Sequence, residues 1–268
     1  MKHALLLPPV GPLSDPHAFV EVAVEAERAG WDGVFIWDHV LRRAGEPPEI
    51  ADPWVALAAV AMATSAVRIG PMVTPLTRRR PIKLARETIT LDHLSRGRLT
   101  LGLGLGVDTS RELSGLGEIV DPRIRGERLD EGVELLTAMW TGEPVTFHGR
   151  HFVADAVTVL PRPLQRPRVP LWFAARGTAR KPVRRAARFD GLVPIEVDPA
   201  GLADMIDVVR AERGTLEGFD IAVGPSGRSE YDAFAELGAT WMTAEIRPHD
   251  VGTALHVAAT SPAVYFDA

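Results

Sequence analysis

Short apolar runs alternate along the chain with longer stretches in which apolar residues recur at helical spacing. The apolar runs lack the regular exchange of apolar and polar positions that marks a strand with one face in water. Strands of an all-parallel sheet are covered on both faces, so they are apolar throughout. The pattern therefore predicts parallel strands at residues 4–7, 33–37, 67–73, 99–103, 171–174, 191–195, 220–223 and 240–245.

An aspartate followed by a proline marks the expected start of several of the intervening helices. The aspartate oxygen can accept a hydrogen bond from an unpaired N–H group of the first turn. Proline suits the first helical position because the N–H that it lacks would be unpaired there. These starts are Asp15-Pro16, Asp52-Pro53, Asp121-Pro122 and Asp198-Pro199.

One stretch, residues 142–170, departs from this alternation. Its residues 144–153 predict a short hairpin, which we interpret as an insertion after the fourth helix. The remaining pattern predicts an α/β fold, a single-domain (β/α)8 TIM barrel over residues 1–268, and the length suits one such barrel. An open doubly wound sheet is the alternative, since one sequence does not give the strand order.

The composition narrows the possible partners and compartments. The chain has a net charge of -5 and no cysteine, which argues against general nucleic-acid binding and excludes disulfides, zinc–thiolate sites and a thiol nucleophile. The apolar stretch near the N-terminus is too short for a signal peptide or a membrane span. We expect a cytoplasmic protein with no nucleic-acid and no membrane partner.

The pair Asp38-His39 stands at the carboxyl end of the expected strand 33–37. In a barrel of parallel strands, the carboxyl ends of the strands carry the chemistry. A histidine can give or take a proton near neutral pH, and an adjacent carboxylate can fix its tautomer. The alternative is an aspartate that caps a helix beside a histidine exposed on a loop.

Alternate glycines occur at the exit of the fourth strand, in the segment 101–107. Without side chains, Gly102 and Gly104 allow the backbone to approach a planar ligand closely, or they serve tight packing inside the barrel. The spacing does not match a dinucleotide-binding fingerprint, because the third glycine comes one residue early and no helix follows at once.

Two basic segments are candidate anion sites. Arg176, Gly177 and Thr178 lie between a strand and a helix, where free N–H groups favour an anion; a solvated basic turn is the alternative. Residues 78–80 are three arginines, which form either a solvated loop or part of a positively charged barrel mouth.

Other common catalytic patterns are missing from the sequence. It contains no His-x-His after the first strand, no Gly-x-Ser-x-Gly nucleophile motif and no phosphate-binding loop of the Gly-x-x-x-x-Gly-Lys type. His148 and His151 fall in the expected hairpin rather than on a helix that would align them. We therefore expect no metal site.

Taken in order, the segments 30–39, 68–76, 86–99, 101–106 and 184–191 resemble the luciferase-like monooxygenase family. The resemblance implies a barrel that binds FMN or the deazaflavin coenzyme F-420 at the carboxyl ends of its strands. It implies that His39 lies by the ring and the substrate as a proton donor or acceptor, and that Asp38 supports His39 or touches the ring edge. The Asp-His pair looks more like the deazaflavin branch.

The resemblance also assigns residues to the cofactor. Members often have a non-prolyl cis peptide behind the ring, which is expected here between Pro71 and Met72. The chain departs from the family pattern in two places. At residues 176–178 many members have a Ser-Gly-Pro-like turn, and the stretch beyond Gly191 is short for the family. The cofactor-binding residues implied are Met72, Val73, Thr74, Gly104, Leu105, Gly106, Val107, Arg176, Gly177 and Thr178.

The expected function is a flavin- or deazaflavin-dependent oxidoreductase, or a monooxygenase, that acts on a small organic substrate with or without a separate flavin reductase. One alternative is a catalytically inactive flavin-binding protein. Another is a sugar-phosphate isomerase or aldolase that uses Glu196 or Glu245 at a strand end. We also expect a homodimer, because the family resemblance implies one and because the second helix is apolar around much of its circumference. The apolar residues of this helix are Trp54, Val55, Leu57, Val60 and Met62.

Overall fold

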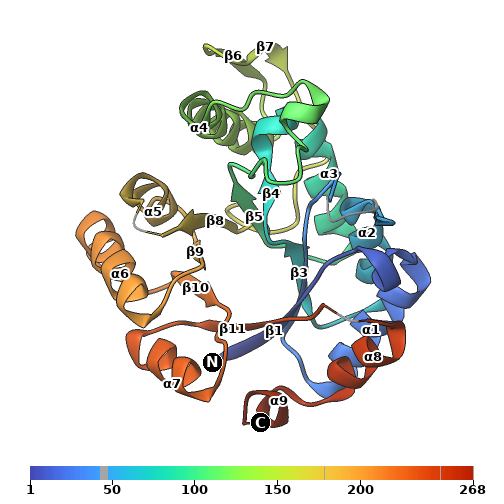
Figure 1. The fold of residues 1–268 in the computed structure, drawn as a ribbon. Helices are drawn as coiled ribbons and strands as arrows, with labels where there is room; N and C mark the ends of the chain where they lie inside the picture. The colour runs from blue at the N-terminus through green and yellow to red at the C-terminus, as the bar shows by residue number, and fades with distance from the viewer. Residues whose placement is uncertain (43–47, 178, 248, 268) are drawn as a thin grey trace.

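A ring of parallel strands surrounded by helices forms the centre of the molecule (Figure 1). The computed structural model describes residues 1–42, 48–177, 179–247 and 249–267. The strands of the ring are β1 (Lys2–Leu7), β2 (Gly33–Ile36), β3 (Arg68–Pro71), β4 (Thr74–Pro75), β5 (Leu101–Gly104), β8 (Leu171–Arg176), β9 (Gly191–Ile195), β10 (Asp220–Val223) and β11 (Trp241–Glu245).

The helices lie on the outside of the ring and connect successive strands (Figure 1). The α-helices are α1 (Pro16–Ala29), α2 (Pro53–Ala63), α3 (Pro81–Leu94), α4 (Pro122–Met139), α5 (Arg180–Ala187), α6 (Pro199–Arg213), α7 (Arg228–Leu237), α8 (Val251–Ala259) and α9 (Pro262–Asp267). Short 3-10 helices are η1 (Gly11–Ser14), η2 (Leu76–Arg78) and η3 (Ser114–Leu116). No helix of the described ranges combines the length and the apolar character that crossing a membrane requires.

The strand order confirms the barrel and excludes the open doubly wound sheet. The order is β3-β2-β1-β11-β10-β9-β8-β5-β4, and the first and last strands of the chain pair directly, Leu5 opposite Ala244. β3 and β4 share the third position of the ring, and a parallel bridge between Ile69 and Leu99 joins β3 to the segment before β5. The sheet therefore closes on itself as a (β/α)8 barrel.

The helix starts predicted from the Asp-Pro pairs are confirmed. The carboxylate of Asp15 accepts from the N–H of His17, and that of Asp52 accepts from the N–H of Trp54 and of Val55. The same arrangement begins α4 at Asp121 and α6 at Asp198. These local caps fix where the helices begin, and so they set the length of the loops that cross the mouth of the barrel.

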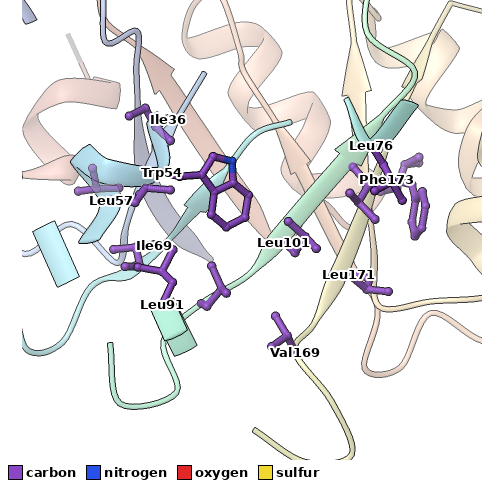
Figure 2. Close-up of a cluster of buried hydrophobic side chains, with 14 of the residues drawn as sticks. Ile36, Trp54, Leu57, Ile69, Leu76, Leu91, Leu101, Val169, Leu171 and Phe173 are labelled. Atoms are coloured by element: carbon purple, nitrogen blue, oxygen red, sulfur yellow. The ribbon is translucent and has the colours of Figure 1, made fainter. Parts of the chain in front are cut away.

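Alternate side chains of each strand point into the barrel and out toward the helices. In β2, Phe35 belongs to the interior with Trp172 and Trp241, whereas Val34 and Ile36 pack in the outer layer. Both layers are apolar, which explains why the strands lack an alternating pattern in sequence. Figure 2 shows part of the outer layer, with Trp54 and Leu57 of α2 beside Ile36 and Ile69 of the strands.

The predicted third strand, residues 67–73, was wrong as a single strand. Only β3, residues 68–71, falls within it; β4 begins just after the predicted range, and a cis peptide bond joins Met72 to Val73 between the two strands. The cis bond was expected one residue earlier, between Pro71 and Met72; Pro71 instead ends β3 in register with Ile36. The chain at this point bulges toward β5, where the glycines of β5 make room for it.

The hairpin insertion is confirmed as β6 (Val145–His148) paired with β7 (Val153–Val157), beside α4 at the edge of the molecule (Figure 1). The carboxylate of Glu131 on α4 accepts hydrogen bonds from the N–H groups of Arg150, His151 and Phe152. The insertion is therefore tied to α4, and His151 also contacts a carboxylate of this helix rather than a metal cluster among the described residues.

The segment 86–99, part of the family resemblance, stabilises the amino end of the barrel. Asp92 is fully buried and accepts from the N–H groups of Leu164 and Gln165. Arg98 donates to the carbonyl oxygens of Ala61, Thr64, Val67 and Ser95. A partly buried guanidinium with this many acceptors ties the ends of α2 and α3 together, so this motif has a structural role.

Candidate active site

Asp38 and His39 follow β2 at the carboxyl-terminal mouth of the barrel, as predicted, but their side chains have different surroundings. Asp38 is only 3% exposed, and His39 is partly exposed. Asp38 belongs to a buried charge cluster, and His39 pairs with a different carboxylate.

Asp38 is the acceptor at the centre of that cluster. Arg78 and Arg79 each place Nη2 at 2.8 Å from one of its carboxylate oxygens. Thr74 Oγ1 donates at 2.8 Å and Trp54 Nε1 at 3.2 Å. Both oxygens are thus occupied by donors from β4, η2 and α2, and Asp38 is neither a helix cap nor an exposed loop residue.

His39 is held by a carboxylate that the sequence analysis did not select. Its Nδ1 lies 2.7 Å from Oε1 of Glu112, whose side chain is 2% exposed. The other oxygen of Glu112 accepts from Arg78 Nη1 at 3.1 Å and from the N–H of Val40 at 3.2 Å. An ionised Glu112 accepts from Nδ1–H, so neutral His39 carries its lone pair on Nε2 and can take a proton there.

Burial opposes the ionisation of Glu112, but the hydrogen bond and charge of His39, the N–H of Val40 and the charge of Arg78 outweigh it and lower the pKa of Glu112. The unfolded chain titrates this group near its ordinary pKa of 4.5, and the folded chain titrates it lower. The stability that these contacts contribute is complete above about pH 4.5 and is lost as the pH falls through the lower pKa of the folded state.

Glu112 was missed because no short-range pattern marks it. It lies in the polar stretch after β5, 73 positions from His39 in sequence. Its neighbour Arg111 has a positive φ of 58°, and the N–H groups of Leu113 and Ser114 bond to Asp108. This folded-back loop brings Glu112 next to His39. The one signal in the sequence is that the loop follows a barrel strand, where functional residues of such barrels lie.

The glycines of β5 are explained first by packing. A Cβ on Gly102 would lie 2.4 Å from the carbonyl oxygen of Pro71, and one on Gly104 would lie 2.8 Å from Cγ2 of Val73. Contacts that short do not occur, so these positions accept no side chain while Met72 and Val73 bulge toward them. The packing alternative is thus correct for Gly102, and it accounts for Gly104 as well.

The backbone after β5 is fixed in place. Arg125 of α4 donates through Nη1 to the carbonyl oxygens of Leu105 and Gly106, and Thr77 Oγ1 donates to Leu105. Gly106 has a φ of +74°, which favours glycine, and Val107 is exposed. The loop therefore presents a rigid edge to the mouth of the barrel.

The second predicted anion segment lies on the neighbouring strand. Arg176 ends β8 and forms an ion pair with Glu196 at the end of β9, and Gly177 has a φ of +56° with open space around it. Thr178 lies outside the described residues. Helix α5 begins at Arg180, and its N-cap residue, Ala179, has no polar side chain to accept from the first turn. The N–H groups of this helix start and its exposed basic residues favour an anion.

The predicted site residues gather on one edge of the sheet. His39, the Met72–Thr74 segment and the Gly104–Val107 segment follow adjacent strands, and Arg176 follows the next strand, β8. Glu196 and Glu245, the carboxylates considered for isomerase chemistry, form ion pairs with Arg176 and Arg247. The mouth thus combines one oriented histidine, a bulged segment beside glycines, and a basic helix start.

Comparison with known proteins gives matches over most of the chain. A family model described as luciferase-like monooxygenase matches residues 5–229. An F420-dependent glucose-6-phosphate dehydrogenase of Nakamurella multipartita is 36% identical over 182 residues, which are 66% of this chain and 52% of that protein. An uncharacterized protein of Mycobacterium tuberculosis is 36% identical over 196 residues, 70% of this chain and 67% of that protein. The chain spans about half the length of several curated relatives that it matches.

Solved structures share the fold at low identity. An F420-dependent secondary alcohol dehydrogenase in complex with an F420–acetone adduct superposes with a TM-score of 0.81 at 19% identity, covering 95% of this chain and 96% of that one. The coenzyme F420-dependent tetrahydromethanopterin reductase of Methanopyrus kandleri has a TM-score of 0.81 at 15% identity and 99% coverage of both. The FMN complex of the oxygenating constituent of 3,6-diketocamphane monooxygenase from Pseudomonas putida has a TM-score of 0.70 at 21% identity, covering 84% of this chain and 66% of that one.

Proposed function

Because the chain belongs to the luciferase-like monooxygenase family, we propose that it is an oxidoreductase that binds coenzyme F-420 or FMN at the mouth of its barrel and acts on a small organic substrate. The His39–Glu112 pair is the observation that supports this activity most directly. A buried carboxylate that orients a partly exposed histidine is an arrangement for moving a proton. When bound, the flavin or deazaflavin supplies the redox chemistry.

The residues of the mouth fit such a cofactor. The rigid edge after β5 and the bulge at Met72–Val73 give a planar ring a surface to lie against, without a side chain at Gly104. The space around Gly177 and the start of α5, where Ala179 provides no capping oxygen, suit a phosphate group. We propose that Arg176, Gly177 and Thr178 hold that phosphate and that the cofactor-facing edge includes Thr74, Leu105, Gly106 and Val107.

His39 moves the proton in the proposed reaction. Among the described residues, His39 makes its side-chain hydrogen bond through Nδ1, to Glu112. Its Nε2 can therefore give a proton to the substrate or take one from it. Glu112 is a positioning residue, since it fixes the tautomer and stabilises the imidazolium when His39 is protonated. We propose that Asp38 supports His39 indirectly, by holding Arg78 where it bonds to Glu112.

We favour coenzyme F-420 over FMN because the Asp-His pair resembles the deazaflavin branch and because the relative with 36% identity carries an F420-dependent name. FMN with reduced-flavin chemistry would require a separate flavin reductase as partner. The cofactor also decides whether hydride transfer or oxygen activation is the reaction to assay. A direct binding measurement distinguishes these two cases.

A spectroscopic titration of the purified protein with coenzyme F-420, and separately with FMN, tests the cofactor. We expect saturable binding of coenzyme F-420 at micromolar or lower Kd. Arg176→Gln is expected to weaken it by roughly 10- to 100-fold, because one charge-assisted hydrogen bond to phosphate contributes roughly 1.5–3 kcal/mol. Arg184→Gln is the control, since Arg184 lies on α5 and pairs with Glu212. Binding of neither cofactor would contradict the proposed function.

We propose further that the protein is a homodimer that pairs through α2. Trp54, Leu57 and Val60 pack inside the molecule, whereas Val55 and Met62 are 68% and 69% exposed on the opposite face of the helix. Apolar side chains this exposed along one face favour burial by a partner. A cleft of about 300 Å³ adjoins the end of this face, and it is lined by Ala61, Met62, Ala63, Thr64, Ser65, Leu94, Arg96 and Arg98.

Met62→Glu is expected to convert the dimer to a monomer at micromolar protein, because a dimer interface would bury the new charge without a partner. Light scattering coupled to size-exclusion chromatography gives the mass directly. Val153→Glu is the matched control, since Val153 is equally exposed on β7, far from α2. A wild-type protein with the mass of a monomer would contradict this assembly.

A further inference from the structure

Two arginines stack on one tryptophan at the mouth of the barrel. The guanidinium carbon of Arg42 lies 4.4 Å from the ring centroid of Trp37, and that of Arg247 lies 5.4 Å from it. Both distances are within the range of a cation–π contact. We call these residues the Arg42–Trp37–Arg247 stack. They come from the end of β2 and from the segment after β11, which are separated by one strand, β1.

The stack concentrates positive charge. Arg42 and Arg247 contact the same ring, which keeps their two guanidinium groups near each other. Among the residues that the structure describes, Glu245 is the carboxylate that pairs with one of these two arginines, Arg247. A guanidinium that lies over a ring keeps its planar N–H donors for a ligand, and these match the oxygens of a carboxylate or a phosphate.

The stack is also adjacent to the proton-transfer residue. The ring of Trp37 contacts that of His39 edge to face, with 5.7 Å between centroids. Trp37 thus contacts both arginines and His39, so an anion bound to the arginines would lie on the side of the mouth that holds His39. A small substrate with its anionic group there can place another carbon beside the imidazole.

The cofactor phosphate has a different place in the proposed complex. Arg176 and the start of α5 follow β8, and the strand order puts β10 and β9 between β11 and β8 on one side. On the other side, β3, β4 and β5 lie between β2 and β8. The two basic regions therefore lie on opposite sides of the mouth, so one small cofactor phosphate occupies only one of them.

From this geometry we propose that the Arg42–Trp37–Arg247 stack binds the carboxylate or phosphate group of the substrate, so that the substrate is a small anionic molecule. This inference rests on the proposed function, in which the α5 side holds the cofactor. It identifies Arg42 and Arg247 as substrate-binding residues and Trp37 as the residue that positions them. It also predicts that neutral substrates of the same size bind more weakly.

Calorimetric titrations with inorganic phosphate and with acetate test the stack. In the wild type loaded with its cofactor, we expect one of these anions to bind and to change the fluorescence of Trp37, a change that Trp37→Phe removes. The double variant Arg42→Gln/Arg247→Gln is expected to bind the anion at least about tenfold more weakly, because it loses charge-assisted hydrogen bonds. Acetate binding indicates a carboxylate substrate, and binding of phosphate alone indicates a phosphorylated one.

Arg176→Gln is the matched control, because it removes one basic residue from the opposite side of the mouth. It should leave the anion affinity of the cofactor-loaded protein unchanged and weaken cofactor binding. The double variant should weaken anion binding and leave cofactor binding unchanged. Both arginines of the stack are at least partly exposed, and Arg42→Lys/Arg247→Lys keeps their charge if the glutamine variant does not fold.

The possible failures are distinct. Displacement of the anion from the stack by the cofactor would overturn the inference, because the stack would then be part of the cofactor site. Equal anion affinity in the wild type and the double variant would also overturn it. Failure of the protein to bind either cofactor would overturn the proposed function, and the anion titration of the free protein would still report on the stack.

Discussion

Replacing His39 by asparagine is expected to lower turnover of the cofactor-loaded protein by about 10²- to 10⁴-fold, the usual contribution of a positioned general acid or base. Asparagine can still donate a hydrogen bond to Glu112, but it cannot take or give a proton in this pH range. The effect should therefore appear in kcat, with little change in cofactor affinity. Steady-state kinetics with any substrate that the wild type converts would measure it.

Glu112→Gln is the companion variant. It keeps the shape of the side chain and removes the charge that orients His39 and stabilises its protonated form, so we expect a loss of about 10²-fold or less. Cofactor titration and thermal unfolding serve as controls for both variants, because a general loss of structure would change all three measurements. Full turnover in His39→Asn would show that His39 has no catalytic role.

Replacing Asp38 by alanine is expected to lower the free energy of unfolding by about 3–5 kcal/mol, because it leaves the buried charges of Arg78 and Arg79 without their shared carboxylate. Both arginine side chains are largely buried where they contact Asp38. Denaturant unfolding followed by circular dichroism would measure the loss. The same variant also removes the acceptor of Thr74 and Trp54.

Asp207→Ala is a suitable control for this prediction, since Asp207 is exposed on α6 and its nearest cation, Arg210, lies 3.8 Å away. Its effect should stay within about 0.5 kcal/mol. Asp38 was predicted as a catalytic residue from its place beside His39. If Asp38→Ala kept wild-type stability but lost turnover, that catalytic role would be favoured over the structural one.

The sequence-based predictions that agree best with the structure concern features set by residues close together in the chain. An aspartate before a proline caps a helix through its own backbone, and each of the four predicted caps forms. Apolar runs such as that of β2 become parallel strands because both of their faces are covered. The barrel follows from the repetition of these units, and the conserved handedness of their connections limits the alternatives.

The predictions that differ from the structure concern contacts between residues that are far apart in the sequence. The arginines at 78–80 were expected either on a solvated loop or at a positively charged barrel mouth. Arg78 and Arg79 do lie at the mouth, but they are largely buried and paired with Asp38. The cis bond was placed one residue early because the register of β3 with β2, which includes Pro71, is a property of the assembled sheet. Glu112 could not be paired with His39 because the loop that carries it has no regular pattern.

The sequence by itself therefore determined the alternation of parallel strands and helices, the hairpin insertion and the location of His39 at a strand end, because periodicity and capping are local properties of the chain. The strand order, which only the folded chain shows, decided that the sheet closes as a barrel. Only the tertiary structure decided which carboxylate serves His39 and which serves the arginines. A buried charge requires a partner, and whichever opposite charge the fold brings within hydrogen-bonding distance becomes that partner. Here the fold pairs Glu112 with His39 and Asp38 with Arg78 and Arg79.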